Sequence, residues 1–162
     1  MEIRLMRMEG LPEALFGIGL SYGLTSEYEG WDDVPFDKRM KLQEIASRLC
    51  KAGAGEDKFL RQVVCWWDVT APRYWWAEAD TFKVATTAQS ESTMHTVMKR
   101  PLEERDFEYS VSGSVRNSLN RMFLEYSETK DERVFLELKN ALPEGFLQRR
   151  IWTLSLANMK NI

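Results

Sequence analysis

The sequence has little of what would point to metal, disulfide or histidine chemistry: its 162 residues include two cysteines and one histidine. Cys50 and Cys65 are too few for a disulfide scaffold, which favours a reducing, cytoplasmic setting. Apolar runs of the roughly 20 residues that span a bilayer are absent, and residues 1–4 lack an apolar signal region, so we expect no membrane association. Lys and Arg number 22 against 25 Asp and Glu, which argues against a nucleic-acid partner.

The composition that remains is that of a globular domain, with 44% hydrophobic and 29% charged residues. A chain of 162 residues buries enough surface to fold without a metal or a disulfide. Internal repeats, low-complexity segments and long linkers are absent. We therefore predict a single domain spanning residues 1–162.

Apolar periodicity predicts a mixture of short strands and amphipathic helices. Residues 57–72 fit a helix or a strand, and the β-branched and aromatic residues of 63–70 favour a strand. Thr129 and Glu132 form a capping-box pattern that predicts the start of a helix ending at Pro143. The other expected elements are strand 2–8, helix 11–22, helix 36–52, helical turns at 74–79, helix 115–126 and a final helix at 146–159.

The stretch from Thr81 to His95 is dense in small hydroxyl groups and has little to bury. Such a segment can bind a phosphate or a polar ring through hydroxyls, amides and Lys83. A solvated loop or a Thr-rich strand also explains it, and these alternatives stay open. An aromatic cluster precedes it, and this cluster predicts either a core or subunit interface or a wall for stacking a flat ring: Trp66, Trp67, Tyr74, Trp75 and Trp76.

Three further patterns have a simpler structural explanation. The glycines of 17–23 lie inside a predicted helix, which favours close helix packing over a dinucleotide fingerprint. Glu91 and His95 share a helical spacing, but two ligands do not make a zinc site, so we expect no metal. The basic pairs at 99–100 and 149–150 are too short to indicate nucleic acid, and we interpret them as solvated faces.

The order of several short motifs is informative. Pro12 precedes Ser21-Tyr22-Gly23, a helix follows, and the predicted strand ends in Ala71-Pro72. Leu142-Pro143 and a segment bearing Asn158 come late in the chain. Over most of its length this layout resembles the flavin-dependent thymidylate synthases. The resemblance implies an α+β fold with several helices and a small, mostly antiparallel sheet.

The resemblance also locates the family's signature, Arg-His-Arg followed by serines. Counted from Ala71-Pro72, Arg-His-Arg falls on Thr81, Phe82 and Lys83, of which only Lys83 keeps a positive charge. The first serine of the signature falls on Thr86, and the acidic or amide position that follows falls near Gln89. The second serine falls near Glu91 or Ser92. Upstream of the signature, the His and Ser that help hold the flavin in the family fall near Glu56 and Lys58.

In that family FAD carries a hydride while a methyl group passes from a folate to dUMP, at sites between subunits of a homotetramer. The resemblance thus implies FAD, a nucleotide ligand and a homo-oligomer, with the tetramer of the family as the expected form, and any remaining activity would be FAD-dependent methyl transfer. We expect Lys83, Thr86 and Thr87 to contact the cofactor. We expect Gln89, Ser90 and Ser92 to contact the substrate, and we assign no catalytic residue.

Two functions remain open at this point. Because the signature has lost its first arginine and its imidazole, we predict a diverged relative that binds a nucleotide or flavin-type ligand, and we doubt synthase activity. The alternative is a non-catalytic assembly protein that kept the fold and lost the site.

Overall fold

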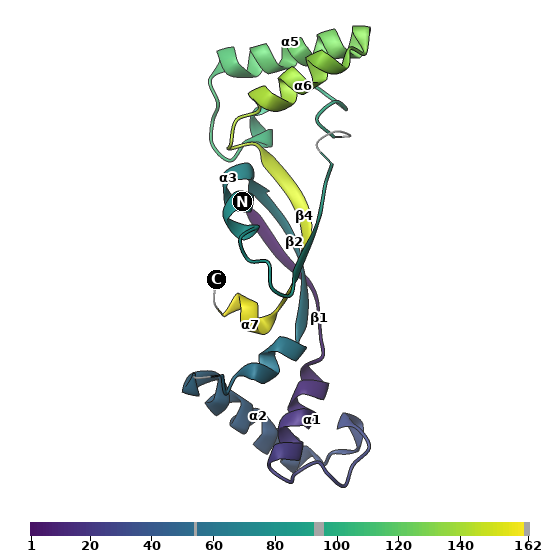
Figure 1. Cartoon of the computed structure of the whole chain (residues 1–162), viewed down its shortest axis with the longest axis vertical. Coiled ribbons are helices and arrows are strands. Elements are labelled where there is room, and N and C mark those ends of the chain that lie inside the picture. The colour runs from purple at the N-terminus through teal and green to yellow at the C-terminus, as the bar shows by residue number, and fades with distance from the viewer. Residues whose placement is uncertain (54, 93–95, 161–162) are drawn as a thin grey trace. The chain divides into compact units, whose positions relative to one another are not determined.

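The computed structural model describes residues 1–53, 55–92 and 96–160. Within these ranges a four-stranded antiparallel sheet has the order β1-β2-β4-β3 (Figure 1). The strands are β1 (Glu2–Glu9), β2 (Val64–Pro72), β3 (Thr86–Ser90) and β4 (Leu147–Ser155). Together with the helices this confirms the α+β prediction and its antiparallel sheet.

The described chain divides into two compact units. Unit 1 comprises Met1–Arg4, Asp68–Lys83 and Ala88–Trp152, and unit 2 comprises Leu5–Trp67, Val84–Thr87 and Thr153–Ile162. Each of the four strands begins in one unit and ends in the other. Since every strand of the sheet is shared in this way, we retain a single domain of residues 1–162 as a proposal.

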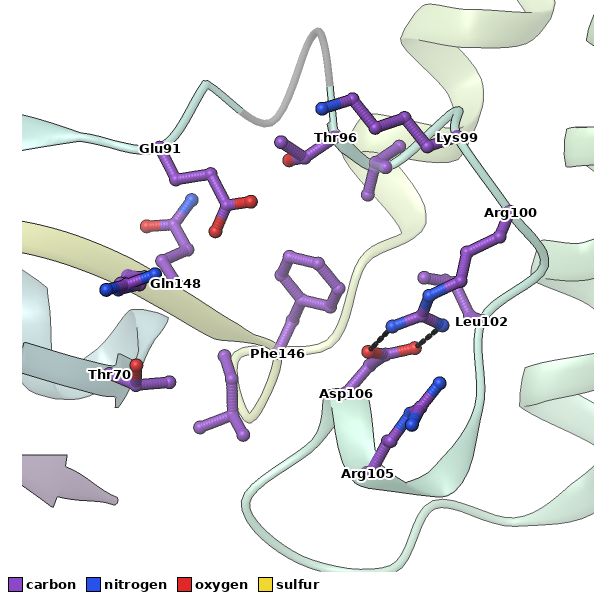
Figure 2. A pocket seen from close by; sticks show the side chains of 13 residues that line it. Thr70, Glu91, Thr96, Lys99, Arg100, Leu102, Arg105, Asp106, Phe146 and Gln148 are labelled. Carbon is purple, nitrogen blue, oxygen red and sulfur yellow. Dashed lines mark hydrogen bonds and ion pairs between the residues drawn. The ribbon is translucent and has the colours of Figure 1, made fainter.

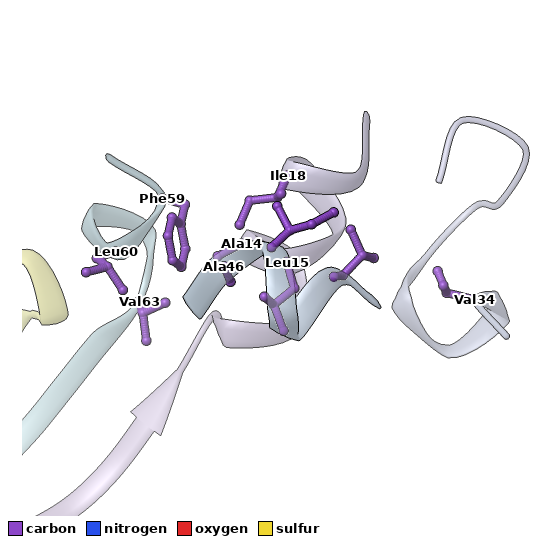
Figure 3. Close-up of a cluster of buried hydrophobic side chains, with 10 residues drawn as sticks. Ala14, Leu15, Ile18, Val34, Ala46, Phe59, Leu60 and Val63 are labelled. Carbon is purple, nitrogen blue, oxygen red and sulfur yellow. The ribbon is translucent and has the colours of Figure 1, made fainter. Parts of the chain in front are cut away.

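Unit 2 is built on helices α1 (Leu11–Ser21) and α2 (Phe36–Ala52) and the short η1 (Trp31–Asp33) and η2 (Lys58–Gln62). Its core consists of apolar side chains from these elements, including Leu15, Ile18, Ile45, Phe59 and Val63 (Figure 3). α1 passes so close to Thr25 that a Cβ on Gly19 would collide with that side chain. The predicted role of a helix glycine in close packing is therefore confirmed at Gly19.

Unit 1 contains α3 (Arg73–Ala79), η3 (Glu104–Asp106), α5 (Gly113–Thr129) and α6 (Glu132–Ala141). α5 and α6 lie side by side and enclose a core with Leu119, Phe123, Phe135 and Leu138 (Figure 1). α6 starts differently from the prediction, because the Asp131 side chain accepts the hydrogen bond from the Arg133 N–H. Thr129 instead ends α5, so the capping box at Thr129 is wrong.

The largest error concerns the end of the chain. The helix predicted over 146–159 is a strand, β4, followed by the single turn α7 (Leu156–Met159). Trp152 and Leu154 are buried two residues apart, which is the spacing of one strand face. β4 lies between β2 and β3, so its backbone hydrogen-bonds to a strand on each side. This pairing favours a strand over the helix that the spacing of its apolar residues suggested.

The aromatic cluster of the sequence contributes to the core of unit 1. Trp76 is 1% exposed, and its ring packs edge-on against Trp75 and Trp152. Its indole N–H donates to the Gln148 carbonyl at 3.0 Å. For Trp76 the core alternative is therefore confirmed. Cys50 and Cys65 are free thiols, and no described helix has the length and apolar character needed to cross a bilayer.

Candidate functional site

The polar segment begins with a strained turn that is held by the last helix. Ala85 has φ +55°, in the left-handed region that costs a residue with a side chain about 1–2 kcal/mol. The Asn158 amide donates to the Val84 carbonyl at 2.7 Å, and its oxygen accepts from the Ser155 hydroxyl at 2.5 Å. The amide nitrogen of Asn158 therefore holds the backbone of the turn that leads into β3, and the bond from Ser155 orients the Asn158 side chain.

Of the six residues predicted to contact ligand, Lys83 precedes this turn and the other five follow it. Lys83 is exposed, and Thr86 and Thr87 open β3, so the Thr-rich strand alternative is correct for this part of the segment. Gln89, Ser90 and Ser92 are exposed at its end. These six are not among the lining residues of the cavities described below, and their ligand contacts stay a prediction.

The proposed absence of a metal rests on residues that the structure covers only in part. His95 lies outside the described residues, so the pairing of Glu91 and His95 cannot be described. Among the described residues there is no group of three or more His, Cys, Asp or Glu side chains placed to hold a metal ion.

Unit 1 contains a cavity of about 530 Å³ that we name the cationic cleft (Figure 2). Its lining includes four basic and two acidic side chains: Lys99, Arg100, Arg105, Arg149, Glu91 and Asp106. Neutral polar and apolar groups complete it, including Thr70, Thr96, Gln148, Val97, Leu102 and Phe146. The excess of positive charge suits a phosphate or another anion.

Most of the arginine charge in the cleft is already paired. Arg100 donates two hydrogen bonds to the Asp106 carboxylate, at 2.8 and 2.6 Å, and Arg105 pairs with Glu103 at 2.8 Å. Lys99 has no ion-pair partner among the residues that the structure describes. Its ammonium is therefore the group in the cleft that an incoming anion would satisfy at the lowest cost.

Arg149 is held at the edge of the cleft by a buried carboxylate. Asp68, 8% exposed on β2, accepts from Arg149 Nε and Nη2 and from Arg4 Nη2, all at 2.7 Å. The bonds from Arg149 and then from Arg4 hold the pKa of the Asp68 carboxyl well below its ordinary value. The three side chains also line a second cavity of about 610 Å³ in unit 1.

Glu91 and Gln148 approach the cationic cleft from the side opposite Arg100. Figure 2 shows the Glu91 carboxylate directed towards the open middle of the cleft and the Gln148 amide beside the Glu91 side chain, with the Phe146 ring between them and Arg100. The Glu91 backbone N–H bonds to the Arg149 carbonyl at 2.8 Å, which fixes the start of this segment beside β4. The Glu91 carboxylate has no ion-pair partner among the described residues.

Unit 2 has a cavity of its own, of about 630 Å³, between α1 and the segment 56–62. Tyr22 and Phe59 contribute aromatic surface, Lys58 and Arg61 contribute positive charge, and Glu56 contributes the one negative charge of the lining. Lys58 and Glu56 stand at the positions that the resemblance assigns to holding a flavin.

Sequence reasoning missed the cationic cleft, because its basic residues come from segments about 45 positions apart. The solvated-face interpretation of 149–150 is wrong for Arg150, whose side chain is 14% exposed, stacks on Trp76 and pairs with Asp80 at 2.9 Å. Recognising 147–155 as a strand would have separated Arg149 and Arg150 onto opposite faces. Lys99 and Arg100 are exposed, yet both belong to the cleft.

Solved structures share this fold, although neither a protein-family model nor a curated protein matches the sequence. Thymidylate synthase X (ThyX) from Helicobacter pylori with FAD and dUMP aligns with a TM-score of 0.72 and 15% identity, over 99% of this chain and 81% of that chain. A second H. pylori ThyX structure complexed with FAD and dUMP has the same TM-score and identity, over 99% of this chain and 82% of that chain.

A third neighbour is the UMP/dUMP methylase PolB from Streptomyces cacaoi bound with 5-Br dUMP. It aligns with a TM-score of 0.55 and 12% identity, over 95% of this chain and 73% of that chain. This chain has the ThyX fold. The resemblance drawn from motif order is thereby confirmed as a statement about the fold, which at this level of identity carries no activity with it.

Proposed function

We propose that this chain binds a nucleoside phosphate, with the phosphate in the cationic cleft. The observation that carries the proposal is the convergence of Lys99, Arg100, Arg105 and Arg149 on one cavity. Support comes from the fold, because the ThyX structures contain dUMP and PolB contains 5-Br dUMP. In the proposed complex Lys99 supplies the unpaired cation. Gln89, Ser90 and Ser92 do not line the cleft, and their contacts with a substrate stay a prediction from the sequence.

We propose a flavin-type cofactor for the cavity of unit 2, since the ThyX structures contain FAD. The side chains present fit such a group: Lys58 and Arg61 can pair with a pyrophosphate, and Tyr22 and Phe59 offer aromatic surface for a flat ring. The cofactor contacts proposed for Lys83, Thr86 and Thr87 are a separate proposal, because these residues do not line the cavity of unit 2. When bound, a flavin supplies hydride transfer, and the protein binds and orients it.

The alternative function, assembly, is favoured by one specific observation. All eight residues of the edge strand β1 are exposed, and Ile3, Leu5, Met6 and Met8 are between 42% and 53% exposed. An exposed edge strand offers unpaired backbone groups to another chain, and in β1 the four apolar side chains alternate with or adjoin four charged ones. A homo-oligomer that covers β1 is therefore proposed, and it is compatible with ligand binding. Light scattering coupled to gel filtration measures it: a monomer at all concentrations would contradict it.

Titration calorimetry with dUMP tests the phosphate site. Lys99→Ala should weaken binding at least tenfold, because a charge-assisted hydrogen bond contributes about 1.5–3 kcal/mol. Lys41→Ala, which removes an exposed charge from α2, is the matched control and should bind as wild type does. If wild type, Lys99→Ala and Lys41→Ala bound dUMP with equal affinity, the cleft would be refuted as the phosphate site.

The absorbance spectrum of the purified protein tests the flavin proposal. A flavin band that co-purifies, or that persists through gel filtration after FAD is added, supports it. Tyr22→Ala and Arg61→Ala should then reduce the bound fraction. A colourless protein whose melting temperature does not respond to FAD would refute it and leave the nucleotide proposal standing on its own measurement.

A further inference from the structure

The acidic end of the cationic cleft does not fit the ring of a uridine nucleotide. Glu91 presents a carboxylate without an ion-pair partner in the described chain, at the side of the cleft away from Arg100 (Figure 2). An ionised carboxylate only accepts hydrogen bonds. The pairing edge of uracil has one N–H between two carbonyl oxygens, so a facing carboxylate meets at least one like-charged oxygen.

Guanine presents the complementary pattern. Its ring N–H and its exocyclic amine are adjacent donors, and both can point at the two oxygens of one carboxylate. Such paired, charge-assisted bonds are among the strongest that proteins make to neutral ligands. The carbonyl next to the ring N–H needs a donor, and the side-chain amide of Gln148 supplies one beside Glu91.

The rest of the cleft accommodates the other parts of such a nucleotide. Phe146 lies between Glu91 and Arg100, and its ring, 7% exposed, gives the cleft an apolar surface that the edge of a base can contact. Lys99 offers the phosphate a cation with no ion-pair partner among the described residues, whereas Arg100 and Arg105 are already paired with Asp106 and Glu103. A volume of about 530 Å³ lies within the range typical of small-molecule sites.

We propose that the cationic cleft selects a guanine nucleotide, with Glu91 as the residue that discriminates guanine from uracil. The proposal rests on the proposed function, since it takes the phosphate to lie beside Lys99. It departs from the pyrimidine nucleotides of the structural neighbours at the position where the resemblance places the family's second serine, near Glu91.

The experiment compares GMP, IMP and UMP by titration calorimetry on wild type, Glu91→Gln and Glu125→Gln. Wild type should bind GMP at least tenfold tighter than UMP, the scale of discrimination by a good bidentate pair, with IMP between them because it lacks the amine. Glu91→Gln should reduce the GMP preference to within about threefold. Glu125→Gln, an exposed acid on α5, should keep the wild-type ratio.

Inorganic phosphate is the internal reference. Its affinity should be the same in wild type and Glu91→Gln, which shows that the variant is folded and that the phosphate end is intact. Equal binding of GMP and UMP by wild type, or an unchanged ratio in Glu91→Gln, would overturn the selection of guanine while the nucleotide proposal survives. Failure of every nucleotide and of phosphate to bind would overturn both.

Discussion

Arg149 on β4 and Asp68 on β2 face each other across adjacent strands and share two parallel hydrogen bonds, Nε to Oδ1 and Nη2 to Oδ2, each 2.7 Å long. Arg4 on β1 completes a row of three charged side chains over three neighbouring strands. The row ties the sheet of unit 1 together and fixes the guanidinium that lines the cationic cleft. Because the row contains the ionised carboxylate of Asp68, its contribution to stability depends on pH.

Asp68 should make the protein acid-sensitive in a defined range. Its folded pKa is below its unfolded value of about 3.9, so its stabilisation is complete above that pH and declines as the pH falls towards the folded pKa. Asp68→Asn should therefore be less stable than wild type at pH 7, and the difference should shrink between pH 4 and 2.5. Urea unfolding at a series of pH values measures it. An undiminished difference at pH 2.5 would contradict the ionic role.

The two lysines proposed as phosphate or cofactor contacts can be separated by substitution. Lys83→Ala should weaken FAD binding and leave phosphate affinity unchanged, whereas Lys99→Ala should weaken phosphate binding at least tenfold. Because both side chains are exposed, neither change should move the melting temperature by more than a degree or two. Calorimetry with inorganic phosphate, together with a flavin fluorescence titration, tells them apart. If Lys83→Ala lost phosphate affinity instead, the phosphate site would have to be moved to the signature position.

Two glycines of the same helix should respond in opposite directions. Gly19→Ala places a methyl group against the buried Thr25 side chain, and overpacking of this kind costs about 1–3 kcal/mol. Gly17→Ala meets its nearest neighbour, an oxygen of Gln62, at 4.0 Å, so the alanine should stabilise α1 by about 0.5–1 kcal/mol. Urea unfolding of the two variants checks the pair. Similar effects for both would refute the close approach of α1 to Thr25.

The two units should unfold together, since each strand runs through both. Leu138→Ala in unit 1 and Leu42→Ala in unit 2 each remove a fully buried side chain, and each should cost about 2–5 kcal/mol. Both should lower the midpoint of one shared transition, followed by tryptophan fluorescence and far-UV circular dichroism. A variant that splits the transition into two phases would show that residues 1–162 form two domains.

The elements whose signals are local were predictable from the sequence. The bounds of α2 agree with the prediction, 36–52, because its apolar period is regular and Gly53 follows it with φ +69°. β4 could not be recognised in the same way. Its strand character depends on β2 and β3, which lie far away in the sequence, and its apolar positions also fit a helical spacing.

The site shows the same division. The polar stretch 81–92 stands out by composition, and the structure places the expected residues along β3 and its ends. The charge of the cationic cleft comes from residues 99–105 and 149, which are far apart in the sequence and line one cavity in the fold. No local pattern encodes that proximity. The fold could be predicted from the order of the short motifs along the chain, because that order is retained when individual residues are substituted.

The position of β4 has a consequence for synthesis on the ribosome. β4 is made after the other three described strands, yet it lies between β2 and β3. Until Ser155 has left the exit tunnel, β3 has no strand beside it and one side of β2 lacks its ladder of hydrogen bonds. The nascent chain thus carries an open sheet edge from the synthesis of β2 until β4 emerges, and a ribosome stalled before Leu147 would present that edge to chaperones.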